Sequence, residues 1–327
     1  MNYNPPYDIS DKIVSLVASI TEKLTRITIT NNLVSNPKLR RNNRVKTIHA
    51  SLAIENNTLS FCQVTDIING KRVLGPAKDI CEVKNAFEAY NKLLTLNPYA
   101  IDDLLLAHKI LMKELTYEAG KYRSKGVGIF AGEKLVHMAP PAKNVSTLVS
   151  NLIEWVKCEN NVHPLIKSSV FHYEFEFIHP FSDGNGRMGR MWQTLILYQW
   201  NTIFGWLPIE SVIKERQAEY YAVLGECDKV GNSSKFIEYI LSAINDSLKE
   251  VATDQVSVQV PDQVQRLVRV LGNEELSTKE LMNRMGLNHR ANFRENYLIP
   301  AIKLGFIEMT IPDKPNSSKQ RYKKVIT

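Results

Sequence analysis

The sequence contains few cysteines and no long apolar run, and these two absences exclude several classes of protein. Its four cysteines are scattered over 327 residues and no two form a Cys-x-x-Cys pair, so neither a zinc ribbon nor a disulfide framework is expected. The longest mostly apolar stretch, residues 194–209, is short and interrupted by polar side chains, so it predicts a buried helix and not a membrane span. Glycine and proline number 15 and 14, which excludes collagen-like and low-complexity chains.

The rest of the composition is that of a globular protein of two or three domains. Apolar residues make up 44% and charged residues 23% of the chain. The first ten residues, MNYNPPYDIS, lack the basic and apolar segments of a secretory signal. We therefore expect a cytoplasmic protein with reduced thiols and no membrane partner.

Positive charge is concentrated at the C-terminal end. The chain carries a net charge of +7, and residues 262–327 hold 12 Lys and Arg against 7 Asp and Glu, a net charge of +5. This asymmetry indicates a separate module with a polyanionic partner.

Hydrophobic spacing predicts helices for most of the chain. One segment, residues 126–141, instead has the glycine-rich alternation of a β-hairpin that turns near Gly132-Glu133. After a polar stretch at 251–261, two helices, a third helix at 289–304 and two short strands follow the plan of a winged helix. The predicted helices before this module lie at about 8–24, 79–96, 101–115, 145–157, 164–178, 187–200, 213–229 and 234–250.

The segment 179–190, HPFSDGNGRMGR, concentrates the residues that indicate chemistry. Pro180 ends one predicted helix, and a second begins near Arg187. Residues 184–186, Gly-Asn-Gly, tolerate positive φ and can turn successive backbone N–H groups inward at the start of that helix, which makes a cradle for an anion. Arg187 and Arg190 share one helical face and can reach the same phosphate chain.

Two further side chains complete this pattern. Asp183 beside bound phosphates is best explained as a Mg²⁺ ligand. His179 is the nearby side chain that can accept a proton at neutral pH. Together these residues predict nucleotide-dependent transfer to a hydroxyl; a solvated loop at a helix start is the alternative. A zinc site made by His172, Glu176 and His179 is disfavoured by Pro180, and His172 is expected to be a hydrogen-bonded helix histidine.

The segment resembles the motif HPFx[D/E]GNGRxxR of the Fic family. The resemblance implies a mainly α protein, a Fic-fold helical bundle with a β-hairpin flap followed by a small winged helix-turn-helix domain. It also implies an enzyme that transfers AMP from ATP to Ser, Thr or Tyr hydroxyls of a protein, including itself. The kinase-like Doc subgroup is disfavoured because it lacks the intact GNGR. All fixed positions of the motif match: His179, Pro180, Phe181, Asp183, Gly184, Asn185, Gly186, Arg187 and Arg190.

The resemblance also implies roles for these residues. His179 deprotonates the acceptor hydroxyl, Asp183 holds Mg²⁺, and Phe181 anchors the loop in the core. ATP binds along the motif, with the two arginines at the β- and γ-phosphates. The residues expected to bind the nucleotide are Asp183, Gly184, Asn185, Gly186, Arg187, Met188, Gly189 and Arg190.

Residues 51–56, Ser-Leu-Ala-Ile-Glu-Asn, fit the inhibitory motif [S/T]xxxE[G/N] of the same family. Its position resembles the subgroup with an N-terminal inhibitory helix. Ser51 and Glu55 share one helical face, and a Glu55 carboxylate paired with Arg190 would occupy the group meant for the γ-phosphate. Asn56 tolerates the left-handed conformation. An exposed glutamate near a helix end is the alternative.

Two regions outside the motif are candidates for contacts with the substrates. In the family the hairpin is a flap that aligns a target segment, so Leu135, Val136, His137 and Met138 are expected to face the site. A purely structural hairpin is the alternative. Tyr221 matches a tyrosine that contacts the nucleotide, although a core aromatic fits equally well.

The resemblance, together with the polar stretch and the order of the predicted C-terminal elements, divides the chain into an N-terminal region with the inhibitory helix (1–100), a catalytic core (101–250), a linker (251–261) and a winged helix (262–327). Residues 289–324 of the last module are candidates for binding DNA, with a protein-docking domain as the alternative. Removal of AMP by the same site, a DNA-binding regulator that senses nucleotide, and a homodimer also remain open. The DNA candidates are His289, Arg290, Asn292, Arg294, Asn296, Lys314, Lys319, Arg321, Lys323 and Lys324.

Overall fold

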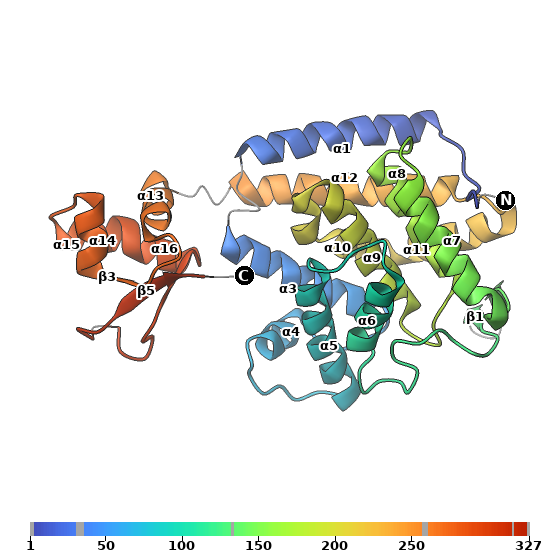
Figure 1. Cartoon of the computed structure of the whole chain (residues 1–327), viewed down its shortest axis with the longest axis horizontal. Coiled ribbons are helices and arrows are strands. Elements are labelled where there is room, and N and C mark those ends of the chain that lie inside the picture. The colour runs from blue at the N-terminus through green and yellow to red at the C-terminus, as the bar shows by residue number, and fades with distance from the viewer. Residues whose placement is uncertain (1–2, 31–35, 132–133, 257–260, 316, 326–327) are drawn as a thin grey trace. The chain divides into compact units, whose positions relative to one another are not determined.

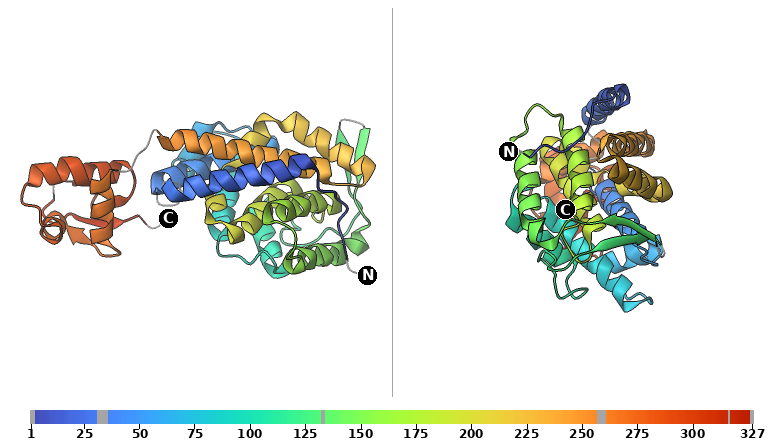
Figure 2. Two further views of the ribbon diagram at one scale, coloured as in Figure 1. Left: turned by 90° about the horizontal axis from the view of Figure 1, so that it is seen from above. Right: turned by 90° about the vertical axis from the view of Figure 1, so that its right-hand side faces the viewer.

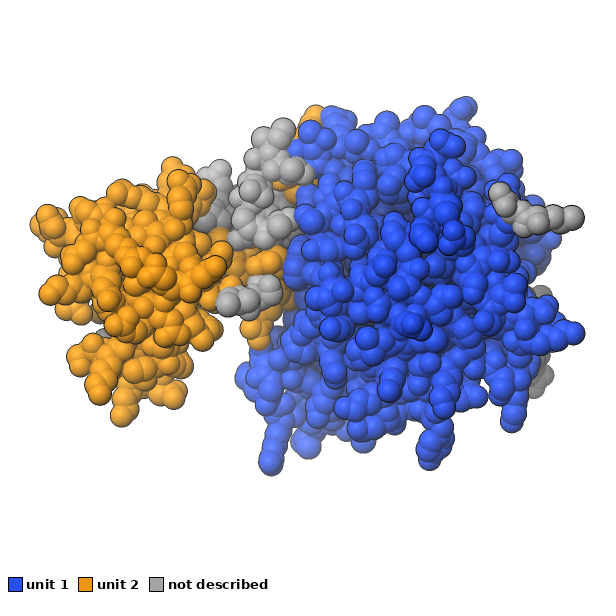
Figure 3. All heavy atoms as spheres, in the orientation of Figure 1, with its two compact units in different colours: residues 1–25, 44–250 blue, residues 26–43, 251–327 orange. Residues whose placement is uncertain are grey.

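The computed structural model describes residues 3–30, 36–131, 134–256, 261–315 and 317–325, and most of these residues are helical (Figure 1). The chain forms two compact units (Figure 3). The first unit comprises Met1–Thr25 and Arg44–Glu250, and the second comprises Arg26–Asn43 and Val251–Thr327. Within the described ranges, no helix combines the length and the apolar character that a membrane crossing requires.

Helices that follow one another account for most of the chain before residue 257, as the hydrophobic spacing predicts. The centre is formed by α8 and α9, and α9 buries apolar side chains such as Met191 and Leu195 completely. The bounds are α1 (Asp11–Thr30), α3 (Pro37–Ile54), α4 (Phe61–Ile68), α5 (Ala77–Leu93), α6 (Ile101–Leu111), α7 (Val145–Cys158), α8 (Pro164–Ile178), α9 (Asn185–Trp200), α10 (Ile209–Glu215), α11 (Gln217–Val230) and α12 (Ser234–Val256).

Several predicted helices differ from the observed ones in their bounds, and two examples show why. The helix predicted at 213–229 is two helices, because the chain leaves helical geometry at Arg216, where φ is −109° and ψ is 31°. The helix predicted at 234–250 continues to Val256, so the first residues of the predicted linker are helical. Both differences arise because hydrophobic spacing marks the apolar face of a helix more clearly than its ends.

The N-terminal helix α1 lies alongside α12 (Figures 1 and 2). Ser19 Oγ and Lys23 Nζ both donate to Asn245 Oδ1, at 3.1 and 2.8 Å, and Ser10 Oγ donates to Glu238 at 2.6 Å. The two ends of the first unit are therefore joined side by side and cover the central helices.

The predicted hairpin is present as β1 (Gly128–Ala131) and β2 (Lys134–Met138). The two strands are antiparallel, with Gly128 opposite Met138. The predicted turn at Gly132-Glu133 lies outside the described residues, as do the side chains of Leu135, Val136 and His137.

The second unit contains the C-terminal module, residues 262–325, in which helices pack on a small sheet. The sheet has the order β3-β5-β4 and is antiparallel, with Leu276 opposite Tyr322. The predicted order of helices and strands is confirmed, β3 is an addition, and the identity as a winged helix stays a prediction. The elements are α13 (Asp262–Leu271), β3 (Leu276–Ser277), α14 (Thr278–Met285), α15 (Arg290–Phe293), the π-helical turn η3 (Arg294–Leu298), α16 (Ile299–Lys303), β4 (Ile307–Met309) and β5 (Arg321–Lys324).

Candidate active site

The segment 179–190 is a loop whose start is fixed by one buried aromatic ring. Helix α8 ends at Ile178; the C-cap His179 takes the left-handed conformation with φ 49° and donates its amide N–H to the carbonyl of Phe175 at 3.0 Å. Phe181 is completely buried and stacks on His108 with ring centroids 3.6 Å apart and planes 5° apart. The aromatic stack therefore anchors the loop in the core, as expected of Phe181.

The end of the loop is closed by the side chain of Asn185. Its Oδ1 accepts from the Phe181 amide and its Nδ2 donates to the Phe181 carbonyl, both at 2.8 Å. Gly184 has φ 86°, a conformation that favours glycine, and a Cβ on it would lie 2.7 Å from the sulfur of Met112. Both the backbone conformation and the lack of space therefore require glycine at this position. Because the Asn185 side chain is used inside the loop, only its backbone can contribute to an anion cradle.

His108, on α6, supports the loop, and this role was not predicted from the sequence. Its Nδ1 accepts the Gly120 N–H at 2.9 Å, so the ring proton lies on Nε2, which donates to the Asp183 carbonyl at 3.0 Å. Burial lowers the pKa of His108 to about 4, and the charge of Arg187 acts in the same direction. His108 is therefore neutral at pH 7, as its two hydrogen bonds require.

Arg123 is a second support that was missed, and it joins the loop to the base of the hairpin. Its Nε donates to the His179 carbonyl at 2.7 Å and its Nη2 donates to the Pro140 carbonyl at 2.6 Å. The guanidinium is buried, and burial lowers the pKa of Arg123. A planar guanidinium with several fixed donors suits this role better than a lysine would.

The tautomer of His179 follows from one contact. Its Nδ1 lies 3.3 Å from the carbonyl oxygen of Glu176, and a carbonyl can only accept, so Nδ1 carries the proton. The basic lone pair is then on Nε2. The ring is partly exposed, so a substrate hydroxyl can reach it.

Arg187 is held between two carboxylates. Its Nη2 donates to Asp183 Oδ1 at 3.0 Å, and its Nη1 lies 3.4 Å from Glu82 Oε1. Asp183 Oδ1 also accepts the Gly184 N–H at 2.6 Å, while 52% of the Asp183 side chain stays exposed. Glu82, on α5, was not predicted from the sequence to belong to the site. It holds a buried arginine in place from a distant helix.

Arg190 makes the contact that the inhibitory motif predicts. Its Nη2 donates to Glu55 Oε1 at 2.8 Å and to the Ser51 carbonyl at 3.0 Å, and its Nε donates to Ser51 Oγ at 3.3 Å. Burial by itself lowers the pKa of Arg190, but the charge and hydrogen bond of Glu55, together with Tyr220 and Glu176, raise the pKa above its ordinary value. Glu55 is 30% exposed, and Asn56 after it has φ 67°.

Glu55 also covers the start of α9. A Cβ built on Gly186 would collide with the Glu55 carboxylate and would lie 3.0 Å from Arg190 Nη1. Among the residues that the structure describes, Nη1 of Arg190 and Nε of Arg187 are both buried without a hydrogen-bond partner. The arrangement therefore leaves N–H donors at a helix N-terminus beside a carboxylate, which is the pattern of an anion site with a competing anion in place.

The C-terminal end of α3, immediately before Glu55, is held by two side chains, one from α10 and one from α11. Lys214 Nζ donates to the Ala53 carbonyl at 2.8 Å, and Gln217 Nε2 donates to the Ile54 carbonyl at 2.9 Å. The last carbonyls of a helix have no partner within the helix, and these two donors bond to them; the Ala53 carbonyl also accepts the Asn56 N–H at 3.2 Å. We call Lys214 and Gln217 the helix clasp.

Two residues predicted to bind the nucleotide lie in the core. Met188 is completely buried, and a Cβ on Gly189 would lie 2.9 Å from Glu176 Oε1 on α8. Gly189 therefore allows α8 and α9 to approach closely, and Met188 fills space behind the loop. For both residues, the structure supplies a packing reason for the side chain.

His172 is a hydrogen-bonded helix histidine, as expected. Its Nδ1 donates to Gln193 Oε1 at 2.6 Å, and its Nε2 accepts from the Tyr220 hydroxyl at 3.1 Å. Burial lowers the pKa of His172 to about 3. Across the described ranges, no three metal-ligating side chains come together. Tyr220 is buried, and Tyr221 beside it is 47% exposed, so a contact between Tyr221 and the nucleotide stays a prediction.

Comparisons with known proteins place the chain among Fic proteins. The Fic/DOC family profile matches residues 98–197, and the profile of the C-terminal domain of "Filamentation induced by cAMP protein Fic-like" matches residues 262–324. The crystal structure of a Fic family protein from Desulfovibrio desulfuricans G20 is 50% identical and covers 99% of each chain, with a TM-score of 0.76.

Curated relatives carry the name protein adenylyltransferase. The Caenorhabditis elegans protein fic-1 is 29% identical over 205 residues, which are 59% of this chain and 38% of that protein. A probable protein adenylyltransferase from Aquifex aeolicus is 24% identical over 239 residues, which are 67% of this chain and 73% of that protein. The matched region spans less than half of the length of the nematode and insect relatives.

Proposed function

The chain belongs to the Fic family, and from this premise we propose that it is an autoinhibited protein adenylyltransferase. It transfers AMP from ATP to a Ser, Thr or Tyr hydroxyl of a protein, including itself. The observation that carries the proposal is the ion pair of 2.8 Å between Glu55 and Arg190 beside the start of α9. The names of the curated relatives support the reaction class.

The residues of the loop divide the work of the transfer. His179 Nε2 takes the proton from the target hydroxyl, whose oxygen attacks the α-phosphorus of ATP. The bond from that phosphorus to the bridging oxygen breaks, and pyrophosphate leaves. The backbone N–H groups at the start of α9 and the guanidinium groups of Arg187 and Arg190 stabilise the negative charge on the phosphates.

Asp183 suits a magnesium ion that is shared with phosphates. Its Oδ1 is engaged by Arg187 and Gly184, and about half of the side chain is exposed. Mg²⁺ is usually held by one or two carboxylates together with phosphate oxygens and water, so a single carboxylate fits it. When bound, the ion neutralises charge on the phosphate chain.

Glu55 restrains the reaction because it holds the arginine that the γ-phosphate requires. Arg190 is 2% exposed, so its charge must be paired, and in this structure Glu55 pairs with it. ATP that binds beside this pair loses one contact at its outer phosphate, and its α-phosphorus is then misaligned for attack. The hairpin is proposed to align the target segment by adding it as a strand at the edge of β2.

The test uses protein with Glu55→Gly and ATP labelled at either the α- or the γ-phosphate. Label that enters protein only from the α-position is expected, and His179→Ala in the same background should abolish it. Label that enters only from the γ-position means kinase chemistry and overturns the proposal. Release of AMP from pre-modified protein by wild type, with no transfer by any variant, would instead assign removal of AMP to the site.

A further inference from the structure

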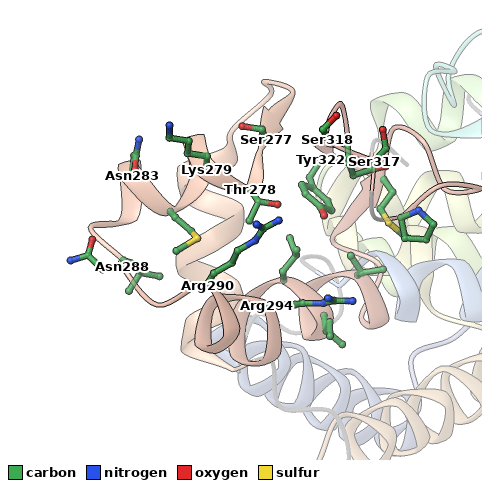
Figure 4. A pocket seen from close by; sticks show the side chains of 18 of the residues that line it. Ser277, Thr278, Lys279, Asn283, Asn288, Arg290, Arg294, Ser317, Ser318 and Tyr322 are labelled. Atoms are coloured by element: carbon green, nitrogen blue, oxygen red, sulfur yellow. The ribbon is translucent and has the colours of Figure 1, made fainter.

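The C-terminal module contains a groove of about 1010 Å³ (Figure 4). One wall is the third helical segment, 290–303, a second is α14, and a third is formed by β4, β5 and the chain between them. The groove lies within the second unit, and its chemistry is independent of the AMP-transfer site.

The walls of the groove carry four cations and no acid. Arg290 and Arg294 lie four residues apart on the same helical segment, 290–303, and both extend along the groove in Figure 4. Lys279 and Lys303 line it as well. Within the described part of this module, none of the four has a recorded ion-pair partner. Other cations of the module do pair with acids: Arg284 with Glu274, Arg321 with Glu280, and Lys323 with Glu308.

The floor of the groove is apolar. Met282 is 8% exposed, and Leu298 and Tyr322 are each 5% exposed. An apolar floor gains free energy from side chains that it removes from water, and the cations above it select acidic groups. The groove is therefore complementary to a chain that carries both kinds of side chain.

Duplex DNA fits this surface less well. A helix that reads bases must project into the major groove and carry cations for the phosphates. Outside the groove, the exposed positions of segment 290–303 supply no cation and one acid: Ala291, Asn292, Glu295 and Asn296. The two arginines instead line a hollow with an apolar floor, which a rigid duplex cannot fill.

We propose that this groove binds an extended acidic segment of a partner protein, with apolar side chains on the floor and carboxylates on the Arg290 and Arg294 wall. Each carboxylate would form a charge-assisted hydrogen bond with a guanidinium. The groove is thus a docking site for a protein, separate from the loop that performs the transfer.

The test measures fluorescence anisotropy of the full chain with a labelled peptide composed of Asp, Glu, Leu and Ser. Arg290→Glu with Arg294→Glu should weaken binding by about tenfold or more, because both contacts become repulsive. The matched control, Arg269→Glu with Lys324→Glu, makes the same charge change at exposed positions of the same unit outside the groove and should change binding less than about twofold. Peptides with Lys in place of the acids, or Ser in place of Leu, should bind more weakly.

Three results would overturn the proposal: no binding of the acidic peptide by wild type, equal loss in the groove and control variants, or tighter binding of duplex DNA that only the groove variant loses. Arg290 and Arg294 are exposed, so their replacement should not unfold the module. Circular dichroism checks this point. Binding is measured without ATP, so failure of the AMP-transfer proposal leaves the result interpretable.

Discussion

The loop at 179–190 and the groove of the C-terminal module both contain arginines, but these arginines differ in burial and in ion pairing. In the loop, Arg187 and Arg190 are buried and bonded to acids of the same chain. In the groove, Arg290 and Arg294 are exposed, and no ion pair is recorded for either among the described residues. Internal pairing fixes the geometry of the arginines and, in the proposed mechanism, also competes with a ligand for them, whereas unpaired exposed cations provide charge without a fixed shape.

The largest effect is expected at the reacting group of the loop. In the Glu55→Gly background, His179→Ala should lower AMP transfer about 10²–10⁴-fold, because the proposed general base is lost. Initial rates with α-labelled ATP measure this. Arg269→Ala in the second unit is the control and should leave the rate within about twofold. Transfer that survives His179→Ala would show that another group takes the proton.

Loop anchoring should also be visible in stability. Phe181→Ala should lower the free energy of unfolding of the first unit by about 3–5 kcal/mol, because a completely buried ring is removed. Arg290→Ala should change stability by less than about 0.5 kcal/mol. Tryptophan fluorescence in denaturant follows the first unit alone, since Trp155, Trp192, Trp200 and Trp206 all lie in it, and circular dichroism follows the whole chain. Similar losses of unfolding free energy in Phe181→Ala and Arg290→Ala would contradict the difference between a buried loop anchor and an exposed groove arginine.

Burial of His108 predicts a pH dependence. Its pKa is about 4 in the folded chain, against an ordinary 6.5, so the unfolded chain binds the extra proton between these values. Stability is therefore lost as the pH falls from 6.5 to 4, by roughly 3 kcal/mol from this residue. The charged groups that face the ring are Asp183 and Arg187.

The difference between wild type and His108→Gln isolates this contribution, because other titrating groups cancel. The unfolding free energies of wild type and His108→Gln, measured at several pH values between 4 and 7, should differ most near pH 7 and approach each other as the pH falls to 4. Parallel curves would mean that His108 is not buried as a neutral ring.

The helix clasp should have a smaller effect on activity. Lys214→Met with Gln217→Leu removes the side-chain donors from two carbonyls at the end of α3, and basal transfer should rise about fivefold as Glu55 loses this support. In the Glu55→Gly background the same pair should change nothing. Lys229→Met, at an exposed position of α11, is the control. If the clasp variant still raised the transfer rate in the Glu55→Gly background, the helix clasp would act by a route that does not involve Glu55.

The helices and the loop were predictable because their signals are local. The apolar spacing of α8 and α9, the stop at Pro180 and the glycines at 184 and 186 all lie within one short stretch. The ion pair of Glu55 and Arg190 joins residues 135 positions apart, and it was found only through a second motif that resembles a known family.

The supports of the loop could not be predicted, because their contacts are distant in sequence and carry no motif. His108 bonds to a residue 75 positions away, Arg123 to one 56 positions away, and Arg187 reaches Glu82 over 105 positions. Each of the supporting residues is an ordinary polar position in its own segment. The groove escaped for a similar reason, since helical spacing shows which residues share a face but not which face is hollow.

The central claim is that the Glu55 charge on Arg190 separates the idle enzyme from the active one. The direct measurement compares initial rates of α-label transfer for wild type, Glu55→Gln and Glu55→Gly. Both variants should exceed wild type, with Glu55→Gly about 10–100-fold faster and Glu55→Gln intermediate, because the amide keeps the shape but loses the charge. Equal rates for wild type and Glu55→Gly would contradict the claim.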